Sequence, residues 1–289
     1  MKLGTDNSDL LSSMTLSDLA PFDSLHPMTF VRHDRPILGS LVWMTALGME
    51  GFLVLEGPSS VVGGITPLEV VRALDANVRA PKRTLLRITA REVAVPVPLL
   101  DLKSSMEDLL KELLRSRSYL AAIGDGSKVV GQLTPGSLHR TLMAHPVSKW
   151  ILEQMSIGNL VSRVRSLAID TPLEEVIHLI ARSGETLFEV DDGDLAITPA
   201  SLLRPLSSPE TINSFLEDTH AFLSEPLITH RSTLIRLPRV RRDATLHEAL
   251  KTSVESGVCA LKVEDAGFLT IEGLFFGLAE ELLASNVRL

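Results

Sequence analysis

One short phrase, a strand that ends in Thr-Pro and turns directly into a helix, constrains this sequence more than any other feature. It occurs three times, with a recognisable fourth version, at residues 61–69, 129–137, 194–201 and 266–273. The threonines of these copies lie 68, 64 and 72 residues apart and are Thr66, Thr134, Thr198 and Thr270. The chain is therefore one unit of roughly 65 residues written four times, and each copy must fold as the same supersecondary structure.

The third copy shows the order of elements most clearly. An apolar run at 167–169 precedes Asp-Thr-Pro-Leu-Glu, which predicts a helix capped by Thr171 with Glu174 completing a capping box. Apolar residues then recur at helical spacing: Leu173, Val176, Ile177 and Ile180. Two short strands follow at 186–190 and 194–197, and the repeated threonine opens a second helix. Each unit is therefore predicted to be β-α-β-β-α, a mixed α/β (α+β) fold.

The organisation of the whole chain follows from the repeat. One helix stripe and three short strands cannot cover both of their apolar faces, so the units are expected to associate as two pairs. The stretch 144–159 is the natural boundary between the pairs. The predicted divisions are a disordered leader at 1–21 and units 1 to 4 at 22–80, 81–146, 147–208 and 209–289.

Composition excludes several classes of protein. The chain has 289 residues, of which 45% are hydrophobic and 22% charged, so it can bury a large core. The net charge of −8 and the 4% of aromatic residues disfavour nucleic acid, which needs a basic face and, when single-stranded, stacking platforms. A single cysteine, Cys259, excludes an intrachain disulfide and is expected to pack as a small core residue. Without a signal peptide or a long apolar stretch, the sequence predicts a cytoplasmic protein that does not enter a membrane.

The order β-α-β-β-α with a Gly-x-x-Thr-x-x-acid ending resembles the CBS domain, named after cystathionine β-synthase. Residues 63–69 match that ending most closely, and tandem pairs of such units resemble Bateman modules. The resemblance covers about residues 22–283. Four units in one chain look like the γ subunit of AMP-activated protein kinase and like stand-alone prokaryotic proteins built only of these domains.

The resemblance implies a ligand and a set of residues that would hold it. In the family, the cleft between paired units binds adenosyl ligands such as AMP, ADP, ATP or S-adenosylmethionine. The Thr or Ser contacts ribose or phosphate, and an Asp three residues later holds the ribose hydroxyls. This chain has Glu69 in place of that Asp in unit 1. The matching positions here are Gly64, Thr66, Glu69, Thr134, Ser137, Thr198, Ser201 and Thr270. Only unit 1 keeps an acid, Glu69, because the other units have Ser137, Ser201 and Gly273 at that position, and a serine cannot chelate two hydroxyls with charge assistance.

Other interpretations of the same residues stay open. Thr66-Pro-Leu-Glu69 is also a capping box with Pro at the first helical turn, which needs no ligand. Phosphate groups would need cations, and the candidates at unit edges are Arg32, Arg83, Arg236 and Arg239. The basic run at 236–242 is also suited to an acidic partner, although such runs are commonly only solvated surface.

Motifs for catalysis or metal binding do not occur in the sequence. The eight histidines show no metal-ligand spacing, and no nucleophile elbow, P-loop or dinucleotide fingerprint occurs. The sequence therefore predicts a protein that is not an enzyme, and the resemblance implies a regulatory protein that senses an adenosyl ligand and signals to a partner. The four units are expected to stack either within one chain or, with each pair meeting its symmetry mate, across a homodimer, and the partner is expected to be a second copy or an unknown protein. The alternative is a structural or interaction module. An open pocket at Thr66 and Glu69 would favour sensing, and clefts filled by the protein's own side chains would favour the alternative.

Overall fold

The computed structural model of this protein describes residues 11–18, 23–24, 30–79, 87–191 and 193–285. Unit 1 consists of β2 (Phe30–Arg32), α2 (Ile37–Leu47), β3 (Phe52–Gly57), β4 (Ser60–Ile65) and α3 (Pro67–Arg79). Unit 2 consists of α4 (Ala90–Val93), β5 (Leu99–Asp101), α5 (Met106–Ser116), β6 (Ala121–Gly124), β7 (Val129–Leu133) and α6 (Pro135–Ala144), and α7 (Pro146–Gln154) follows it.

The second half repeats this order. Unit 3 consists of β8 (Arg165–Leu167), α8 (Leu173–Ser183), β9 (Phe188–Val190), β10 (Leu195–Ile197) and α9 (Pro199–Leu202), and α10 (Pro209–Glu217) and α11 (Thr219–Ser224) follow it. Unit 4 consists of β12 (Arg239–Val240), α12 (Leu246–Ser256), β13 (Leu261–Val263), β14 (Gly267–Leu269), a π-helical turn (Gly273–Gly277) and α13 (Leu278–Ser285). The predicted β-α-β-β-α order is therefore confirmed in all four units.

Paired units exchange the segment that precedes their first strand. β1 (Asp23–Ser24), ahead of unit 1, pairs with β7 of unit 2, and Val95, ahead of β5, exchanges two backbone hydrogen bonds of 2.8 and 3.0 Å with Gly64 of unit 1. In the second half, Ser162 pairs with Phe268 of unit 4, and β11 (Ile235–Arg236) pairs with β10 of unit 3. Each exchange joins units 1 and 2 or units 3 and 4, as the predicted pairing requires.

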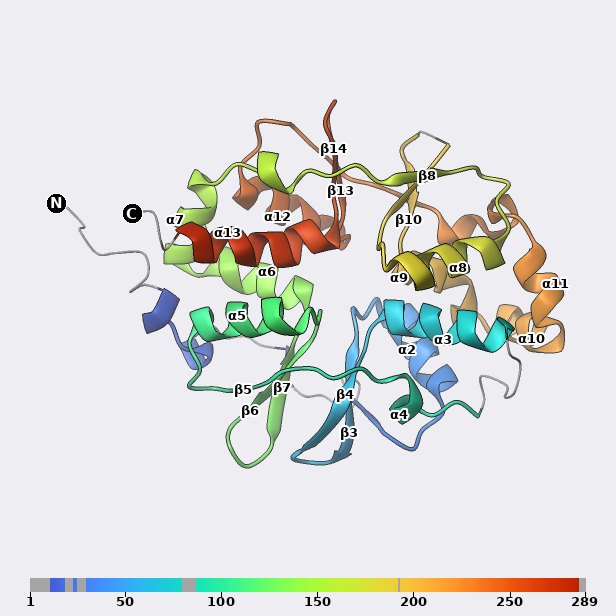
Figure 1. Ribbon diagram of the computed structural model, residues 1–289, viewed down its shortest axis with the longest axis horizontal. Coiled ribbons are helices and arrows are strands. Elements are labelled where there is room, and N and C mark those ends of the chain that lie inside the picture. The colour runs from blue at the N-terminus through green and yellow to red at the C-terminus, as the bar shows by residue number, and fades with distance from the viewer. Residues whose placement is uncertain (1–10, 19–22, 25–29, 80–86, 192, 286–289) are drawn as a thin grey trace.

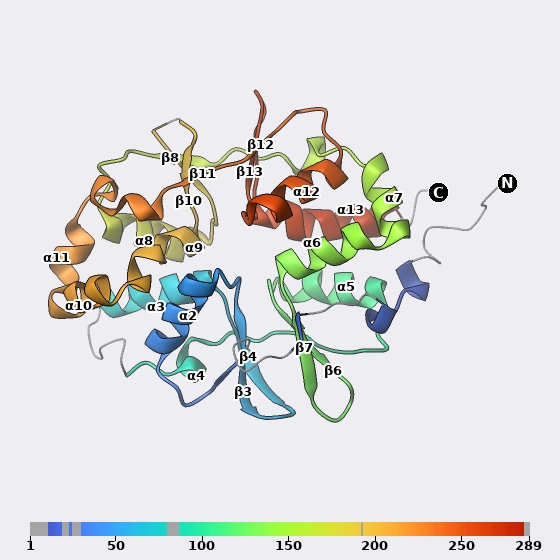
Figure 2. The ribbon, with the colours of Figure 1, turned by 180° about the vertical axis from the view of Figure 1, so that it is seen from behind.

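Apolar side chains between the sheets and between the helices complete the assembly. Leu53 and Leu55 of unit 1 meet Ala122 and Val129 of unit 2 between their sheets, and a similar cluster lies between the sheets of units 3 and 4. The helices face the other way and form two larger cores, one shared by units 1 and 3 and the other by units 2 and 4. Figures 1 and 2 show the result, with the helices as a middle layer between the strands of the two pairs. One chain thus supplies all four units of the assembly.

The structure differs from the sequence predictions in three places. The leader predicted to be disordered over residues 1–21 is packed over residues 11–18, because Leu11 and Leu16 are fully buried and Leu16 N donates to Ser104 O at 2.9 Å. In units 2 and 4 the same repeat predicts first strands at 93–100 and 234–240. Both are interrupted at prolines, whose missing N–H ends a ladder, and the chain changes sheets there. The predicted cap at Thr171 is wrong, since α8 begins after Pro172 without a side-chain cap.

Candidate functional site

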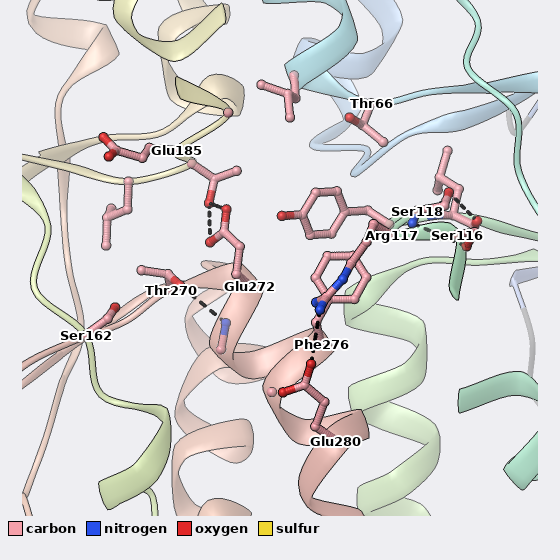
Figure 3. A pocket seen from close by; sticks show the side chains of 18 of the residues that line it. Thr66, Ser116, Arg117, Ser118, Ser162, Glu185, Thr270, Glu272, Phe276 and Glu280 are labelled. Carbon is pink, nitrogen blue, oxygen red and sulfur yellow. Dashed lines mark hydrogen bonds and ion pairs between the residues drawn. The ribbon is translucent and has the colours of Figure 1, made fainter. Parts of the chain in front are cut away.

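One cleft of about 1320 Å³ lies where the four units meet, and all of them contribute to its wall. Unit 1 contributes Gly64, Thr66 and Glu69, and the exchanged segment 95–98 and residues 115–120 of unit 2 face them. Residues 162–164 and 183–187 of unit 3 and the helix start at Thr270 of unit 4 close the other side. We call this cavity the Thr66 cleft (Figure 3).

Gly64 is required by the exchanged segment that forms one wall of the Thr66 cleft. A Cβ atom at this position would lie 2.7 Å from Val97 Cγ1 and 2.8 Å from Leu120 Cδ1, closer than van der Waals contact allows. The glycine predicted as part of the binding motif therefore has a packing role, which is to let unit 2 approach unit 1 closely.

Glu69 caps the helix on which it sits. Its Oε2 accepts hydrogen bonds from the backbone N–H of Thr66 at 3.0 Å and from the Thr66 hydroxyl, while Oε1 accepts from Arg72 at 3.3 Å. Thr66 and Glu69 are 6% and 7% exposed, so the carboxylate is largely withdrawn from solvent and held by three donors. The capping interpretation of these residues is therefore realised in the structure, on the wall of an open cleft.

A second carboxylate, Glu272 of unit 4, projects into the same cleft. Both of its oxygens accept from the Thr186 hydroxyl of unit 3, at 2.6 and 2.7 Å (Figure 3). Burial, and then the negative charge of Glu272, raise the pKa of Tyr119 well above its ordinary value, so that phenol stays protonated. The Tyr119 ring packs on Phe276 with 4.9 Å between ring centroids, which gives the cleft an aromatic wall.

The cations that line the cleft were not among those predicted. They are Arg72, Arg115, Arg117 and Arg163, and the acids around them are Glu69, Glu185, Glu272, Glu280 and Glu281. Arg117 pairs with Glu280 at 3.2 Å and lies over the Phe276 ring at 5.3 Å. Of these arginines, Arg72 carried a sequence signal, because it follows Glu69 by three residues on one helix face.

The arginines predicted as phosphate ligands lie elsewhere. Arg32 pairs with Asp34 at 2.8 Å, Arg239 pairs with Asp194, and Arg236 is exposed on β11. These three do not line the Thr66 cleft, and Arg83 lies outside the described residues. The prediction used charge density along the sequence, whereas the cleft draws its arginines from other elements, and a phosphate contact of the predicted arginines stays a prediction.

The remaining repeated turns are capped by their own side chains. Thr134 N donates to Ser137 Oγ at 2.8 Å and Ser137 N donates to Thr134 Oγ1 at 3.3 Å, and Thr198 and Ser201 make the same pair of bonds at 2.9 and 3.1 Å. Thr198 and Ser201 line a smaller cavity of about 180 Å³. Thr270 accepts from Gly273 N at 3.3 Å on the wall of the Thr66 cleft. Each repeated threonine thus lies at a helix start, and its contact with a ligand stays a prediction.

Within the described part of the chain, no group of three or more His, Cys, Asp or Glu side chains is placed to hold a metal ion. Among the helices of the same ranges, none combines the length and apolarity needed to cross a membrane.

Comparison with known proteins supports the fold. No family model and no curated protein matches the sequence. Two solved structures match over 92% of this chain and 100% of their own. Protein MJ1225 of Methanocaldococcus jannaschii, described as a candidate archaeal homologue of g-AMPK, is 17% identical with a TM-score of 0.76. An uncharacterized conserved protein of Pyrococcus horikoshii is 14% identical with a TM-score of 0.54.

A third solved structure, CBSX2 in complex with AMP, is 16% identical, matches 45% of this chain and 97% of its own, and has a TM-score of 0.37. The resemblance stated from the sequence is therefore confirmed at the level of the fold.

Proposed function

We propose that this chain, which has the fold of CBS-domain proteins in four units, is a regulatory protein that senses an adenosyl ligand in the Thr66 cleft. The observation that carries the proposal is the cleft itself. It has about 1320 Å³ of space beside the one repeated Thr turn, of the four, that keeps an acid three residues later, and it is bounded by segments of both units of the pair. The alternative, a purely structural module, would fill this space with side chains.

The wall chemistry suits a nucleoside. The exchanged segment presents Val95, Pro96 and Val97 across from Thr66 and Glu69, so an apolar wall for a base faces a polar floor for a ribose. Arg72, Arg115, Arg117 and Arg163 line the cleft and are the cations available to a phosphate there. Glu272 would oppose a highly charged phosphate chain. We therefore expect AMP or S-adenosylmethionine to bind better than ATP.

Binding would compete with the cap that Glu69 already makes. A ribose diol must replace or share the bonds that Glu69 receives from Thr66 and Arg72, so we expect a modest affinity. A ligand that touches the segment 95–98 and the Thr66 turn at once fixes unit 2 against unit 1. A partner that prefers that orientation would then sense the ligand through linkage.

The experiment is calorimetry of the purified chain with AMP, ADP, ATP and S-adenosylmethionine, compared with thermal unfolding. A ligand at ~100 times its dissociation constant stabilises the native state by ~2.7 kcal/mol. Glu69→Gln should weaken binding about tenfold or more, because a charge-assisted hydrogen bond is lost, and Ser137→Ala in the Thr134 turn should leave it unchanged. No binding by the wild type, or equal small effects of both substitutions, would favour the structural module.

One observation favours that second candidate function. The turn at Thr134 is closed by side chains of the protein itself, with Glu50 of unit 1 bound to Gly136 N. Three of the four turns also lack the acid. A non-catalytic role, a homodimer and a signalling partner are parts of this proposal and await their own tests.

A further inference from the structure

One position of the repeat brings four different side chains to the centre of the assembly. In each unit the first long helix ends at a residue with positive φ, between 50° and 70°: Gly48, Arg117, Gly184 and Gly257. Two residues later the chain places Glu50, Tyr119, Thr186 and Cys259. Each of these side chains lines a cavity beside the Thr turns or binds a residue of such a turn. The side chain two residues after the end of this helix is therefore the one that each unit places beside the repeated Thr turns.

In unit 1 this position holds an acid that reaches the helix start of unit 2. Glu50 Oε2 accepts a hydrogen bond from Gly136 N at 2.8 Å, and Oε1 accepts from Cys259 Sγ of unit 4 at 2.9 Å. A Cβ atom on Gly136 would lie 2.9 Å from both carboxylate oxygens, so the glycine is required for this approach. One carboxylate thus joins three of the four units.

Gly136 N–H is the donor that an anion would use at this helix. Pro135 has no N–H, and the N–H groups of Ser137 and Leu138 already donate to Thr134. Glu50 is thus the anion bound at the positive end of α6, which has ten residues and so a developed dipole. Burial and the negative charge of Glu50 raise the pKa of Cys259, and the protonated thiol can donate to the carboxylate.

A second side chain fills the space beside this turn. Gln132 occupies the repeat position of Gly64, is 2% exposed, and donates from Nε2 to Gly51 O at 3.3 Å. In unit 1 the same position is Gly64, and Val97 and Leu120 of unit 2 pack where its side chain would lie. The contact that distinguishes the closed Thr134 turn from the open Thr66 cleft is therefore that of Glu50 with Gly136 N.

We propose that Glu50 is an intramolecular ligand of the Thr134 turn. Its carboxylate holds the anion position at the start of α6, so an external anion binds Gly136 N only by displacing it. This contact makes the two turns of the first pair unequal, one open and one occupied by the chain. The inference goes beyond the proposed function, because it holds whether or not an adenosyl ligand binds the Thr66 cleft.

The test follows the Gly136 amide by NMR of glycine-labelled protein during titration with inorganic phosphate. In Glu50→Ala the vacated position should bind phosphate, with a saturable shift of the Gly136 amide at a concentration at least about tenfold below any response of the wild type. The Gly136 amide should also exchange with solvent about tenfold faster or more. Glu56→Ala, at an exposed acid of the same unit that pairs with Arg91, should behave as the wild type.

Two results would overturn the inference. One is a phosphate response of Gly136 that is equal in the wild type and in folded Glu50→Ala, and the other is no response in either. If Glu50→Ala does not fold, Glu50→Gln keeps the shape without the charge and should bind phosphate more tightly than the wild type; an unchanged affinity would count against the proposal. Cys259→Ala removes the other partner and leaves Glu50 in place, so it should not open the turn.

Discussion

The Thr66 and Thr134 turns have nearly the same sequence but differ in whether a ligand can reach them. Residues 61–67 read Val-Val-Gly-Gly-Ile-Thr-Pro and residues 129–135 read Val-Val-Gly-Gln-Leu-Thr-Pro. Both form a strand that enters a helix. The first opens on a cleft of about 1320 Å³, and the second has its free amide bound by Glu50 at 2.8 Å.

This difference shows that the repeated motif specifies where the helix starts. It does not specify whether a ligand can reach the turn. Thr-Pro provides a cap and a first-turn proline wherever it occurs. Access depends on the partner unit's loop, which presents Tyr119 to the first turn and Glu50 to the second. Local structure is thus encoded in the phrase, while the binding site depends on contacts between units.

The largest expected effect on stability comes from displacing the exchanged segment 95–98 from unit 1 at the open cleft. A Cβ atom on Gly63 would lie 2.4 Å from the backbone oxygen of Val95, so Gly63→Ala must push the segment 95–98 away. We expect a loss of about 3 kcal/mol in the free energy of unfolding, measured by urea denaturation. Gly57→Ala in the same sheet meets nothing within 4 Å and should change stability by less than about 0.5 kcal/mol. Equal effects would show that the segment is not held there.

The next effect concerns Thr186, which stands in unit 3 where Glu50 stands in unit 1. The Thr186 hydroxyl donates to both carboxylate oxygens of Glu272 of unit 4, at 2.6 and 2.7 Å, and Thr186→Val would remove this donor. We expect a loss of about 2 kcal/mol in thermal or urea unfolding, because a partly buried charge loses the hydrogen bonds that Thr186 donates. Thr252→Val on α12, whose hydroxyl bonds only a helix carbonyl, is the matched control. A similar small loss in both variants would contradict this role of Thr186.

The sequence predicted the fold because its main signals are local. Stripes such as Leu109, Leu110 and Leu113 are fully buried on α5. The sequence pattern Thr-x-x-Glu at Thr245 and Glu248 is typical of a capping box, and it forms one at the start of α12. Prediction was wrong where the chain changes partners. Residues 93–100 have strand-like composition, but Pro96 and Pro98 separate a segment that pairs with unit 1 from the strand that stays in unit 2.

The candidate site was predictable only in part for the same reason. Thr66 and Glu69 are three residues apart, so their meeting at a helix start follows from local geometry. Arg117 and Glu272 reach the cleft from units 2 and 4. The residues next to them in the sequence do not predict this position. Glu50 carried a weak signal, as an acid two residues after the glycine that ends α2, but its target, Gly136, lies 86 residues away.

Thr66 and Thr134 should also differ in how much each stabilises the protein as a helix cap. Thr134→Ala removes the acceptor for Ser137 N and should cost about 1 kcal/mol, the usual loss of an N-cap. Thr66→Ala also takes the hydroxyl donor from the buried carboxylate of Glu69, so we expect about 2 kcal/mol. Chemical denaturation of both variants measures the difference, and Thr198→Ala, with a Ser partner, should match Thr134→Ala. Equal losses at Thr66 and Thr134 would mean that Glu69 gains nothing from the hydroxyl.

The smallest expected effect is a pH-dependent difference in stability between the hairpin turns of units 1 and 2, which join β3 to β4 and β6 to β7. In unit 2, Asp125 Oδ1 accepts from the Ser127 hydroxyl at 2.7 Å and from the N–H groups of Ser127 and Lys128 at 2.9 and 3.0 Å. These bonds, that of the Ser127 hydroxyl first, lower the pKa of Asp125 from 3.8 to about 2.

Because the folded pKa lies below the unfolded one, the stabilisation by Asp125 is complete above the unfolded value and is lost as the pH falls toward 2. Asp125→Asn should therefore be less stable than the wild type at pH 6, and urea unfolding at pH 6, 4 and 3 should show the gap narrowing. Unit 1 turns through Glu56, Gly57 and Pro58 instead. A gap for Asp125→Asn that stays constant down to pH 3 would contradict the assignment of these three hydrogen bonds to the ionised carboxylate.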